Sequence, residues 1–288
     1  MTIKKGEVSF ITGGASGIGK ALSENLVSQG GRVVIVDLNP ETSKALADEL
    51  NKKAGSTVAV SAKADTTVWE EQVAAYEVAK KAFGRIDYVF ANAGIAEYPW
   101  IPAFDPSTAA SRPFTKPNLL TVNIDLVGQL NTAALAFQIF ERQEKNELGL
   151  RGKLIMTASV FGYYPCPSMP MYAAAKAGIV NFMRSAAEFY KAKDITVNLV
   201  APNLIDTNIA PDSLFVPFRE RNLLTPVSLV VEQFNTLLGS STVTGQALSI
   251  NGEEVWVHPP ESVKFKENDP SCKLIDEEIS KLFGYTKI

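Results

Sequence analysis

Three closely spaced glycines between an apolar run and a helical pattern constrain the fold of this 288-residue chain more than any other feature. Residues 8–12 are typical of a buried strand, and apolar residues recur with a helical period after Gly19. Gly13 permits a tight turn, Gly17 lets the backbone approach a pyrophosphate, and Gly19 lets the helix pack closely on the strand. A strand, a glycine-rich turn and a helix in this order predict a dinucleotide-binding unit, with phosphate at the helix N-terminus.

An acidic residue ends the next predicted strand and indicates which dinucleotide is bound. Asp37 follows Gly19 by eighteen positions, where a carboxylate can accept hydrogen bonds from an adenosine ribose diol and repel a 2′-phosphate. Leu38 comes next and supplies no arginine for such a phosphate. We therefore predict NAD rather than NADP, with a merely solvated Asp37 as the alternative. The cofactor contacts expected from this part of the chain are Gly13, Ser16, Gly17, Ile18, Gly19, Asp37 and Leu38.

Strand-like and helix-like segments alternate along the rest of the chain. Further strands are predicted at residues 32–36, 57–64, 86–91, 152–159, 195–201 and 245–250, and helices at residues 41–54, 68–83, 118–144, 172–191 and 227–238. This alternation predicts an α/β protein with a Rossmann-like, doubly wound parallel sheet of about seven strands and helices on both faces. We expect one Rossmann-type domain over residues 1–258 and an extension, 259–288, that packs on it or on a neighbouring subunit.

Small and polar residues follow several predicted strands. They are Asp65, Thr66, Asn92, Ala93, Gly94 and Ser159. Ligands bind at the carboxyl ends of strands in open parallel sheets, so we expect these residues at one edge and the first five at the cofactor. Asp65 either holds an adenine amino group or caps a helix beginning near Val68, and one residue can do both. The long, proline-rich segment 96–117 follows the fourth strand, where its apolar side chains form either a pocket wall or simple packing.

Tyr172 and Lys176 lie four residues apart in a predicted helix and therefore share one of its faces. A free tyrosine phenol has a pKa near ~10, too high for a base at neutral pH. A lysine ammonium one turn away favours the phenolate. The two side chains can therefore act as an acid–base unit if a cofactor lies beside them.

Composition excludes several classes of function. The net charge is −3 and no basic block occurs, so we expect no nucleic-acid partner. No apolar run is long enough to span a bilayer, and the first residues do not have the pattern of a signal or transit peptide. Cys166 and Cys272 lie far apart and His258 is the single histidine, so we expect neither a disulfide framework nor a metal site. A cytoplasmic location is the resulting expectation.

The chain resembles the short-chain dehydrogenase/reductase family over roughly residues 5–257. The matching elements, in order, are Thr12-Gly13-x-x-x-Gly17-x-Gly19, Asn92-Ala93-Gly94, Asn123, Ser159, Tyr172-x-x-x-Lys176 and Pro202 with Thr207. The resemblance implies a catalytic set of Asn123, Ser159, Tyr172 and Lys176. It also implies cofactor contacts from Tyr172, Lys176, Pro202, Ile205 and Thr207, and assembly as a homodimer or homotetramer through the long helices 118–144 and 172–191.

The resemblance also implies a role for each catalytic residue. Tyr172 takes the proton of a substrate hydroxyl as hydride leaves, or donates it to a carbonyl in the reverse direction. Ser159 hydrogen-bonds the substrate oxygen, and Lys176 holds the nicotinamide ribose. Asn123 anchors a water that links Lys176 to solvent, or is only a structural hydrogen-bonder, and Thr207 binds the nicotinamide carboxamide.

These expectations predict an NAD-dependent oxidoreductase that interconverts a secondary alcohol and a ketone. The segments around the predicted site are rich in apolar residues: Phe161, Tyr163, Tyr164, Met169, Leu204, Ile205, Ile209, Leu214, Phe215 and Phe218. They favour a bulky apolar substrate of terpenoid, steroid, prostanoid or polyketide type, as in secondary metabolism, unless they fill oligomer interfaces instead. The second hypothesis is a non-redox family member, an isomerase, dehydratase, cyclase or ligand-binding protein that retains NAD binding.

Overall fold

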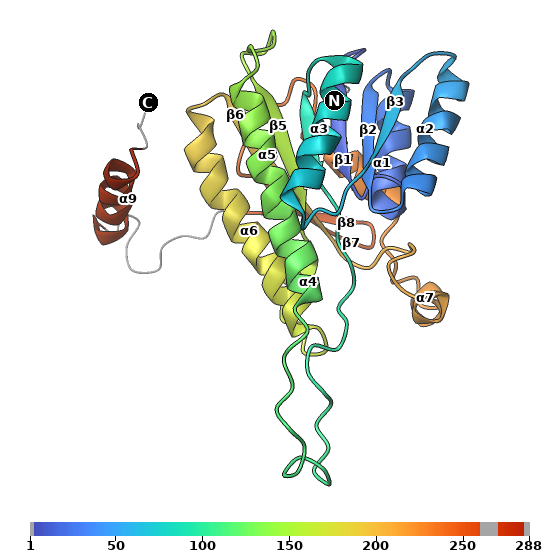
Figure 1. Ribbon diagram of the computed structural model, residues 1–288, viewed down its shortest axis with the longest axis vertical. Helices are drawn as coiled ribbons and strands as arrows, with labels where there is room; N and C mark the ends of the chain where they lie inside the picture. Colours follow the sequence, from blue (N-terminus) through green and yellow to red (C-terminus); the bar gives the residue numbers. More distant parts are fainter. Residues whose placement is uncertain (1–2, 260–269, 285–288) are drawn as a thin grey trace.

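The fold is an eight-stranded sheet between two layers of helices (Figure 1). The computed structural model describes residues 3–259 and 270–284. The strands have the spatial order β3-β2-β1-β4-β5-β6-β7-β8, and all are parallel except β8. Their bounds are β1 Val8–Thr12, β2 Arg32–Asp37, β3 Ala59–Lys63, β4 Tyr88–Ala91, β5 Gly152–Thr157, β6 Ile195–Pro202, β7 Ala247–Asn251 and β8 Glu254–His258. The predicted doubly wound sheet is confirmed.

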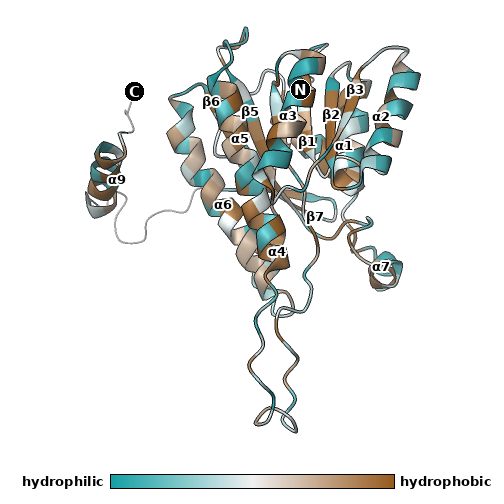
Figure 2. Cartoon of the chain, viewed as in Figure 1, coloured by the Kyte–Doolittle hydropathy of each residue, from teal (hydrophilic) through white to brown (hydrophobic). Residues whose placement is uncertain are grey.

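Helices cover both faces of the sheet and bury two apolar clusters. Their bounds are α1 Gly17–Ser28, α2 Pro40–Ala54, α3 Trp69–Phe83, α4 Leu120–Val122, α5 Gln129–Glu141, α6 Pro170–Lys191, α7 Asp212–Arg219, α8 Val227–Thr236 and α9 Pro270–Leu282. Residues of α3, α5 and α6 pack on one face, and residues of α1, α2 and α8 pack on the other. The strands are mostly hydrophobic, whereas the outer helix faces are hydrophilic (Figure 2). This pattern is expected of a parallel sheet buried on both sides.

Two elements differ from the prediction because their sequences carry weak signals. The strand β8, Glu254–His258, follows a turn at Gly252, whose φ is 58°, and forms an antiparallel edge beside β7. Its side chains are mostly exposed, and its three apolar residues, Val255, Trp256 and Val257, follow one another, so no alternation with a period of two is visible. The helix α7, Asp212–Arg219, contains Pro217 and follows an irregular segment, so the sequence predicts no helix between the strand 195–201 and the helix 227–238.

The predicted long helix 118–144 is interrupted by a wider turn. Residues Asn123–Gly128 form a π-helix between α4 and α5. A π-helical turn holds more residues than an α-helical one and therefore rotates the side chains that follow it. Asp125 and Gly128 are buried here, whereas Asn123 is exposed. This rotation decides which side chain of the helix reaches the site.

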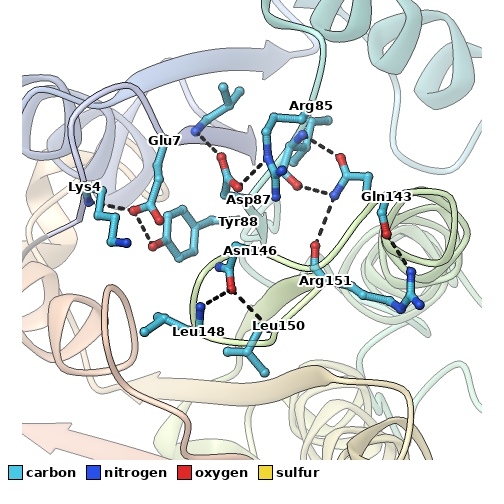
Figure 3. A network of polar contacts seen from close by, with 12 residues as sticks. Lys4, Glu7, Arg85, Asp87, Tyr88, Gln143, Asn146, Leu148, Leu150 and Arg151 are labelled. Atoms are coloured by element: carbon cyan, nitrogen blue, oxygen red, sulfur yellow. Dashed lines mark hydrogen bonds and ion pairs between the residues drawn. The ribbon is translucent and has the colours of Figure 1, made fainter.

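The amino ends of the strands, opposite the predicted site, are joined by polar contacts (Figure 3). Glu7 accepts a hydrogen bond of 2.6 Å from the Tyr88 hydroxyl. Asp87 accepts from the Val8 amide at 2.9 Å and pairs with Arg85 at 2.8 Å. These contacts fix β1 and β4 side by side, so the carboxyl ends of the same strands are held in register.

The tail and the proline-rich loop lie outside this core. Residues 96–117 extend from the sheet as a long loop (Figure 1). Ile101 and Phe104 are exposed and line neither cavity of the site, so neither alternative, packing or a pocket wall, has support for these two side chains. In α9, Leu274 and Ile275 are more than half exposed. The predicted packing of the extension 259–288 stays a prediction, because residues 260–269 and 285–288 lie outside the described residues.

Candidate active site

Asn92 joins three strand ends at the carboxyl edge of the sheet. Its amide group donates to the carbonyl of Thr12, and its carbonyl accepts from the Thr157 hydroxyl, both at 3.1 Å. The Thr12 hydroxyl in turn accepts from the backbone amides of Asn92 and Ala93 at 3.0 and 3.2 Å. Asn92 and Ala93 therefore hold the ends of β1, β4 and β5 together, and the site is built on this edge.

The glycine loop between β1 and α1 has room for an anion. Gly13 and Gly17 have φ values of 63° and 48°, a region that favours glycine. A Cβ atom on Gly19 would lie 2.1 Å from the Gly13 carbonyl oxygen, so only glycine fits there. The first turn of α1 carries no acidic residue, and its cap residue Ser16 makes no side-chain hydrogen bond. The loop and Ile18 line a cavity of about 280 Å³.

Asp37 lies beside this loop at the end of β2. Its carboxylate accepts from the Ala15 amide at 3.1 Å and from the Asn39 amide at 3.2 Å. A second hollow beside it is lined by Asp37, Leu38, Asn39, Pro40 and Glu41. An acidic rim without a basic side chain in this lining fits a ribose diol better than a ribose phosphate.

Asp65 has a different role from the predicted helix cap. Its carboxylate accepts from the Thr67 amide and hydroxyl at 2.8 and 2.7 Å, which closes a local turn. The helix α3 begins at Trp69, and its cap residue, Val68, makes no side-chain hydrogen bond. Thr66 is buried against the π-helix, where Gly128 leaves space for its hydroxyl. The predicted adenine contact of Asp65 stays a prediction.

Ser159, Tyr172 and Lys176 line a single cavity of about 180 Å³. Ser159 follows β5, and its buried hydroxyl oxygen accepts from the Phe161 amide at 3.3 Å. Its proton is therefore free to point at a substrate oxygen. Tyr172 and Lys176 come from α6, and the Lys176 ammonium lies 5.3 Å from the centre of the Tyr172 ring. The predicted trio is thus brought together.

The structure does not bring Asn123 into this cavity. The side chain that meets Lys176 is Asp125, two residues further along the π-helix, with its Oδ2 atom 3.1 Å from the Lys176 Nζ atom. Asp125 Oδ1 accepts from the Ile95 amide at 2.9 Å. The water path predicted through Asn123 therefore has no support, because Asn123 is exposed and does not line this cavity. Sequence reasoning missed Asp125 because an acidic residue in an apolar stretch has no signal without the partner it faces.

The glycine of the Asn92-Ala93-Gly94 motif lies against the ion pair. A Cβ atom on Gly94 would lie 3.1 Å from Asp125 Oδ2 and 3.3 Å from Lys176 Nζ. Lys176 also donates to the carbonyl of Thr157 at 3.2 Å. A larger residue at position 94 would therefore force one of the two charged groups to move slightly.

Asp125 keeps the buried Lys176 charged. Burial disfavours the ammonium, but the charge of Asp125, together with Tyr172, outweighs it and raises the pKa of Lys176. Lys153 provides the comparison within the same chain. It is equally buried and donates to the carbonyls of Gly239 and Ser241. Burial lowers the pKa of Lys153 to about 8, and the charge of Glu7, with which Lys153 forms no ion pair, only partly opposes this.

The remainder of the cavity wall is largely apolar. Thr207 packs against Gly17, 3.3 Å from where a Cβ would be, and so links this cavity to the glycine loop. The two cavities share the residues Ile18, Asn92, Gly94, Ala96, Thr207 and Ile209. The other apolar members of the wall are Ala158, Phe161, Met169, Pro202, Leu204, Ile205, Ala210 and Leu214.

Four residues predicted for this wall lie elsewhere. Tyr163 stacks on His258 with ring centres 3.6 Å apart, and Phe215 is buried but does not line the cavity. Tyr164 is exposed, and Phe218 is not among the lining residues. The loop 96–117 contributes only Ala96.

The family follows from comparison with known proteins. The family model described as short chain dehydrogenase matches residues 7–214 of the chain. This chain belongs to the short chain dehydrogenase family. The membership confirms the resemblance seen in the motifs, and the glycine loop, Ser159, Tyr172 and Lys176 all lie within the matched region.

Several curated members of the family are similar over most of this chain. The short-chain dehydrogenase/reductase ascJ of Acremonium egyptiacum is 31% identical over 73% of this chain and 67% of its own length. The short-chain dehydrogenase/reductase prx4 of Penicillium roqueforti is 32% identical over 77% of this chain. The chain spans only 61% of the length of that protein. Bovine (Bos taurus) 3-hydroxyacyl-CoA dehydrogenase type-2 is 34% identical over 76% of this chain and 80% of its own length.

Solved structures of short chain dehydrogenases share the fold. The 3-hydroxyacyl-CoA dehydrogenase type-2 from Mycobacterium avium superposes with a TM-score of 0.71 at 27% identity, covering 89% of this chain and 98% of that one. The NADPH-dependent 3-quinuclidinone reductase from Rhodotorula rubra has a TM-score of 0.71 at 26% identity, covering 87% and 91%. Within residues 3–259 and 270–284, no helix has the length and apolar content to cross a membrane.

Proposed function

We propose that this short chain dehydrogenase is an NAD-dependent oxidoreductase that interconverts a secondary alcohol and a ketone. The observation that carries the proposal is the meeting of Ser159, Tyr172 and Lys176 in one cavity that adjoins the glycine loop. Hydride transfer to or from a carbon that bears oxygen requires a proton-transfer group beside a dinucleotide-binding loop.

The residues present fit a nicotinamide dinucleotide. The glycine loop and the free amides at the start of α1 suit a pyrophosphate, and Asp37 suits the adenosine ribose. Thr207, against the loop, suits the nicotinamide end. When bound, the dinucleotide supplies or accepts the hydride.

The protein supplies the proton and the orientation. Ser159 donates a hydrogen bond from its hydroxyl group to the substrate oxygen, since its own oxygen already accepts a hydrogen bond from the Phe161 amide. In ketone reduction, Tyr172 gives its phenolic proton to that oxygen as the carbonyl carbon is reduced. In alcohol oxidation, Tyr172 takes the hydroxyl proton back. The Lys176 ammonium stabilises the phenolate that reduction leaves behind.

Replacement of Asp37 by asparagine should weaken the preference for NAD. The amide keeps an oxygen for the Ala15 hydrogen bond, but it no longer repels a 2′-phosphate and accepts more weakly from a ribose diol. Loss of one charged hydrogen bond corresponds to a factor of roughly 10 to 100 in affinity. We expect the ratio of kcat/KM for NAD to that for NADP to fall by at least ~10-fold.

The matched control for this experiment is Glu41→Ala. Glu41 is a second carboxylate of the same hollow, but it lies in the first turn of α2. We expect its ratio to stay within about twofold of wild type. Wild-type protein that uses NADP as well as NAD would contradict the cofactor proposal, and the NADPH-dependent relative of known structure makes this a real test.

A bulky apolar substrate suits the cavity better than a charged one. The charged residues of its lining, Asp125 and Lys176, neutralise each other, and the rest of the wall is largely apolar. Fungal relatives with the name short-chain dehydrogenase/reductase and the 3-hydroxyacyl-CoA dehydrogenases match the chain comparably well, so sequence likeness alone does not choose between them.

The substrate class is tested by NADH absorbance with a panel of alcohols and ketones. Each buried methylene contributes about 0.8 kcal/mol, or roughly a fourfold gain, so kcat/KM should rise with apolar bulk near the carbinol. Addition of a carboxylate to the best substrate should abolish that gain. A preference for small polar alcohols or for a 3-hydroxyacyl-CoA would reject the apolar class. Tight NAD binding without hydride exchange on any member would favour the non-redox alternative.

A further inference from the structure

The structure places a negative charge where it acts on the acid–base tyrosine through the lysine. Asp125 and Lys176 are almost completely buried, with side chains 0% and 3% exposed, and their charged atoms lie 3.1 Å apart. The Lys176 ammonium also lies over the Tyr172 ring, 5.3 Å from the ring centre. Tyr172 therefore faces an ion pair rather than a lone ammonium.

We propose that Asp125 is a positioning residue that cancels the charge of Lys176 and so keeps Tyr172 protonated at neutral pH, in readiness to donate a proton to a ketone. The proposal rests on the proposed function of Tyr172 as the acid and base. It adds which protonation form of Tyr172 the site stabilises, and therefore the pH range in which each direction of the reaction is fastest.

Charge counting within the cluster supports this. When Asp125 is ionised, its carboxylate, the Lys176 ammonium and the Tyr172 phenol together carry no net charge. Loss of the phenolic proton then leaves one buried negative charge. With a neutral residue at position 125, the same loss converts a positive cluster into a neutral one. Burial disfavours net charge, so Asp125 must raise the pH at which the cluster loses its first proton.

The groups described below that contact the pair and the start of α6 add no positive charge to offset that of Asp125. Asp125 Oδ1 accepts from the Ile95 amide, whereas Oδ2 has no well-aligned donor among the described residues, so its contact with Lys176 is electrostatic. The other charged group at the start of α6 is Glu97, whose carboxylate accepts from the Tyr172 amide at 2.7 Å. Glu97 is a second negative charge on the same side. It acts in the same sense as Asp125 and is unchanged by substitutions at position 125.

The variant Asp125→Asn tests the proposal, because asparagine keeps the shape and an oxygen for the Ile95 amide. The first readout needs no cofactor or substrate: the tyrosinate ultraviolet absorbance of each protein, minus that of the same protein carrying Tyr172→Phe, is followed against pH. We expect the midpoint of this difference to be lower in Asp125→Asn than in wild type by ~1 pH unit or more. Asp125→Ser, also neutral, gives the same comparison if the asparagine variant does not fold.

The second readout is the pH profile of each direction of the reaction. We expect alcohol oxidation by Asp125→Asn to reach half of its maximum at a pH lower than in wild type by ~1 unit or more, and ketone reduction to fall to half of its maximum at a correspondingly lower pH. Asp48→Asn, which makes the same change in an exposed ion pair with Lys44 on α2, should leave both midpoints unchanged. Equal midpoints in wild type and both position-125 variants would overturn the role of Asp125 while leaving the proposed function standing. Wild-type activity that survives Tyr172→Phe would instead overturn the proposed function.

Discussion

Replacement of Tyr172 by phenylalanine should abolish turnover while leaving the protein folded. The phenylalanine fills the same half-buried position on α6 but has no proton to give or take. General acid–base catalysis by a positioned side chain typically contributes ~10²- to 10⁴-fold. We expect kcat to fall by that factor in both directions, as measured by NADH absorbance, with NAD affinity changed by no more than about twofold.

Tyr164→Phe is the matched control, since it removes the same hydroxyl from a tyrosine eight positions earlier. Tyr164 is 57% exposed and does not line the cavity. Its kcat should remain near wild type and its thermal midpoint unchanged. Turnover by Tyr172→Phe comparable with that of this control would mean that another group moves the proton, and the mechanism would have to be abandoned.

The fold could be predicted because its determinants are local. The apolar strands, the glycine loop and the alternation of elements can each be recognised from residues close together in the sequence, and the structure confirms them. The elements that escaped prediction depend on neighbours. The edge strand β8 exists because β7 offers a partner, and α7 forms although it contains a proline. The number of strands was therefore one too few.

The site was predicted as far as its residues belong to motifs. Ser159, Tyr172 and Lys176 meet as expected because strand ends and helix faces place them by simple geometry. Asn123 was expected there from the family resemblance, but the π-helix from Asn123 to Gly128 rotates the helix face and presents Asp125 instead. An insertion of this kind within a helix has no signal in an apolar pattern. Self-association, the cytoplasmic location and the adenine contact of Asp65 stay predictions of the sequence.

Replacement of Lys176 by methionine should destabilise the protein strongly. This prediction concerns the contribution of the buried ion pair to stability, apart from its role in proton transfer. Methionine fills the space of the lysine stem but leaves the carboxylate of Asp125 buried without its partner. The loss of one member of a buried ion pair typically costs about 3–5 kcal/mol. We expect the free energy of unfolding, measured in urea, to fall by roughly this amount at pH 8. The deficit should shrink on acidification, because protonation removes the uncompensated charge.

The double variant Lys176→Met with Asp125→Asn isolates the cause. It removes the uncompensated charge while the asparagine oxygen can still accept from the Ile95 amide, so most of the lost stability should return although the enzyme stays inactive. Lys20→Met, which breaks an exposed pair with Glu24 at 3.8 Å, should change stability little. If the double variant were as unstable as Lys176→Met alone, the cost would lie in the lysine packing rather than in the charge of Asp125. In that case the charge of Asp125 would not link the stability of the protein to the protonation of the site.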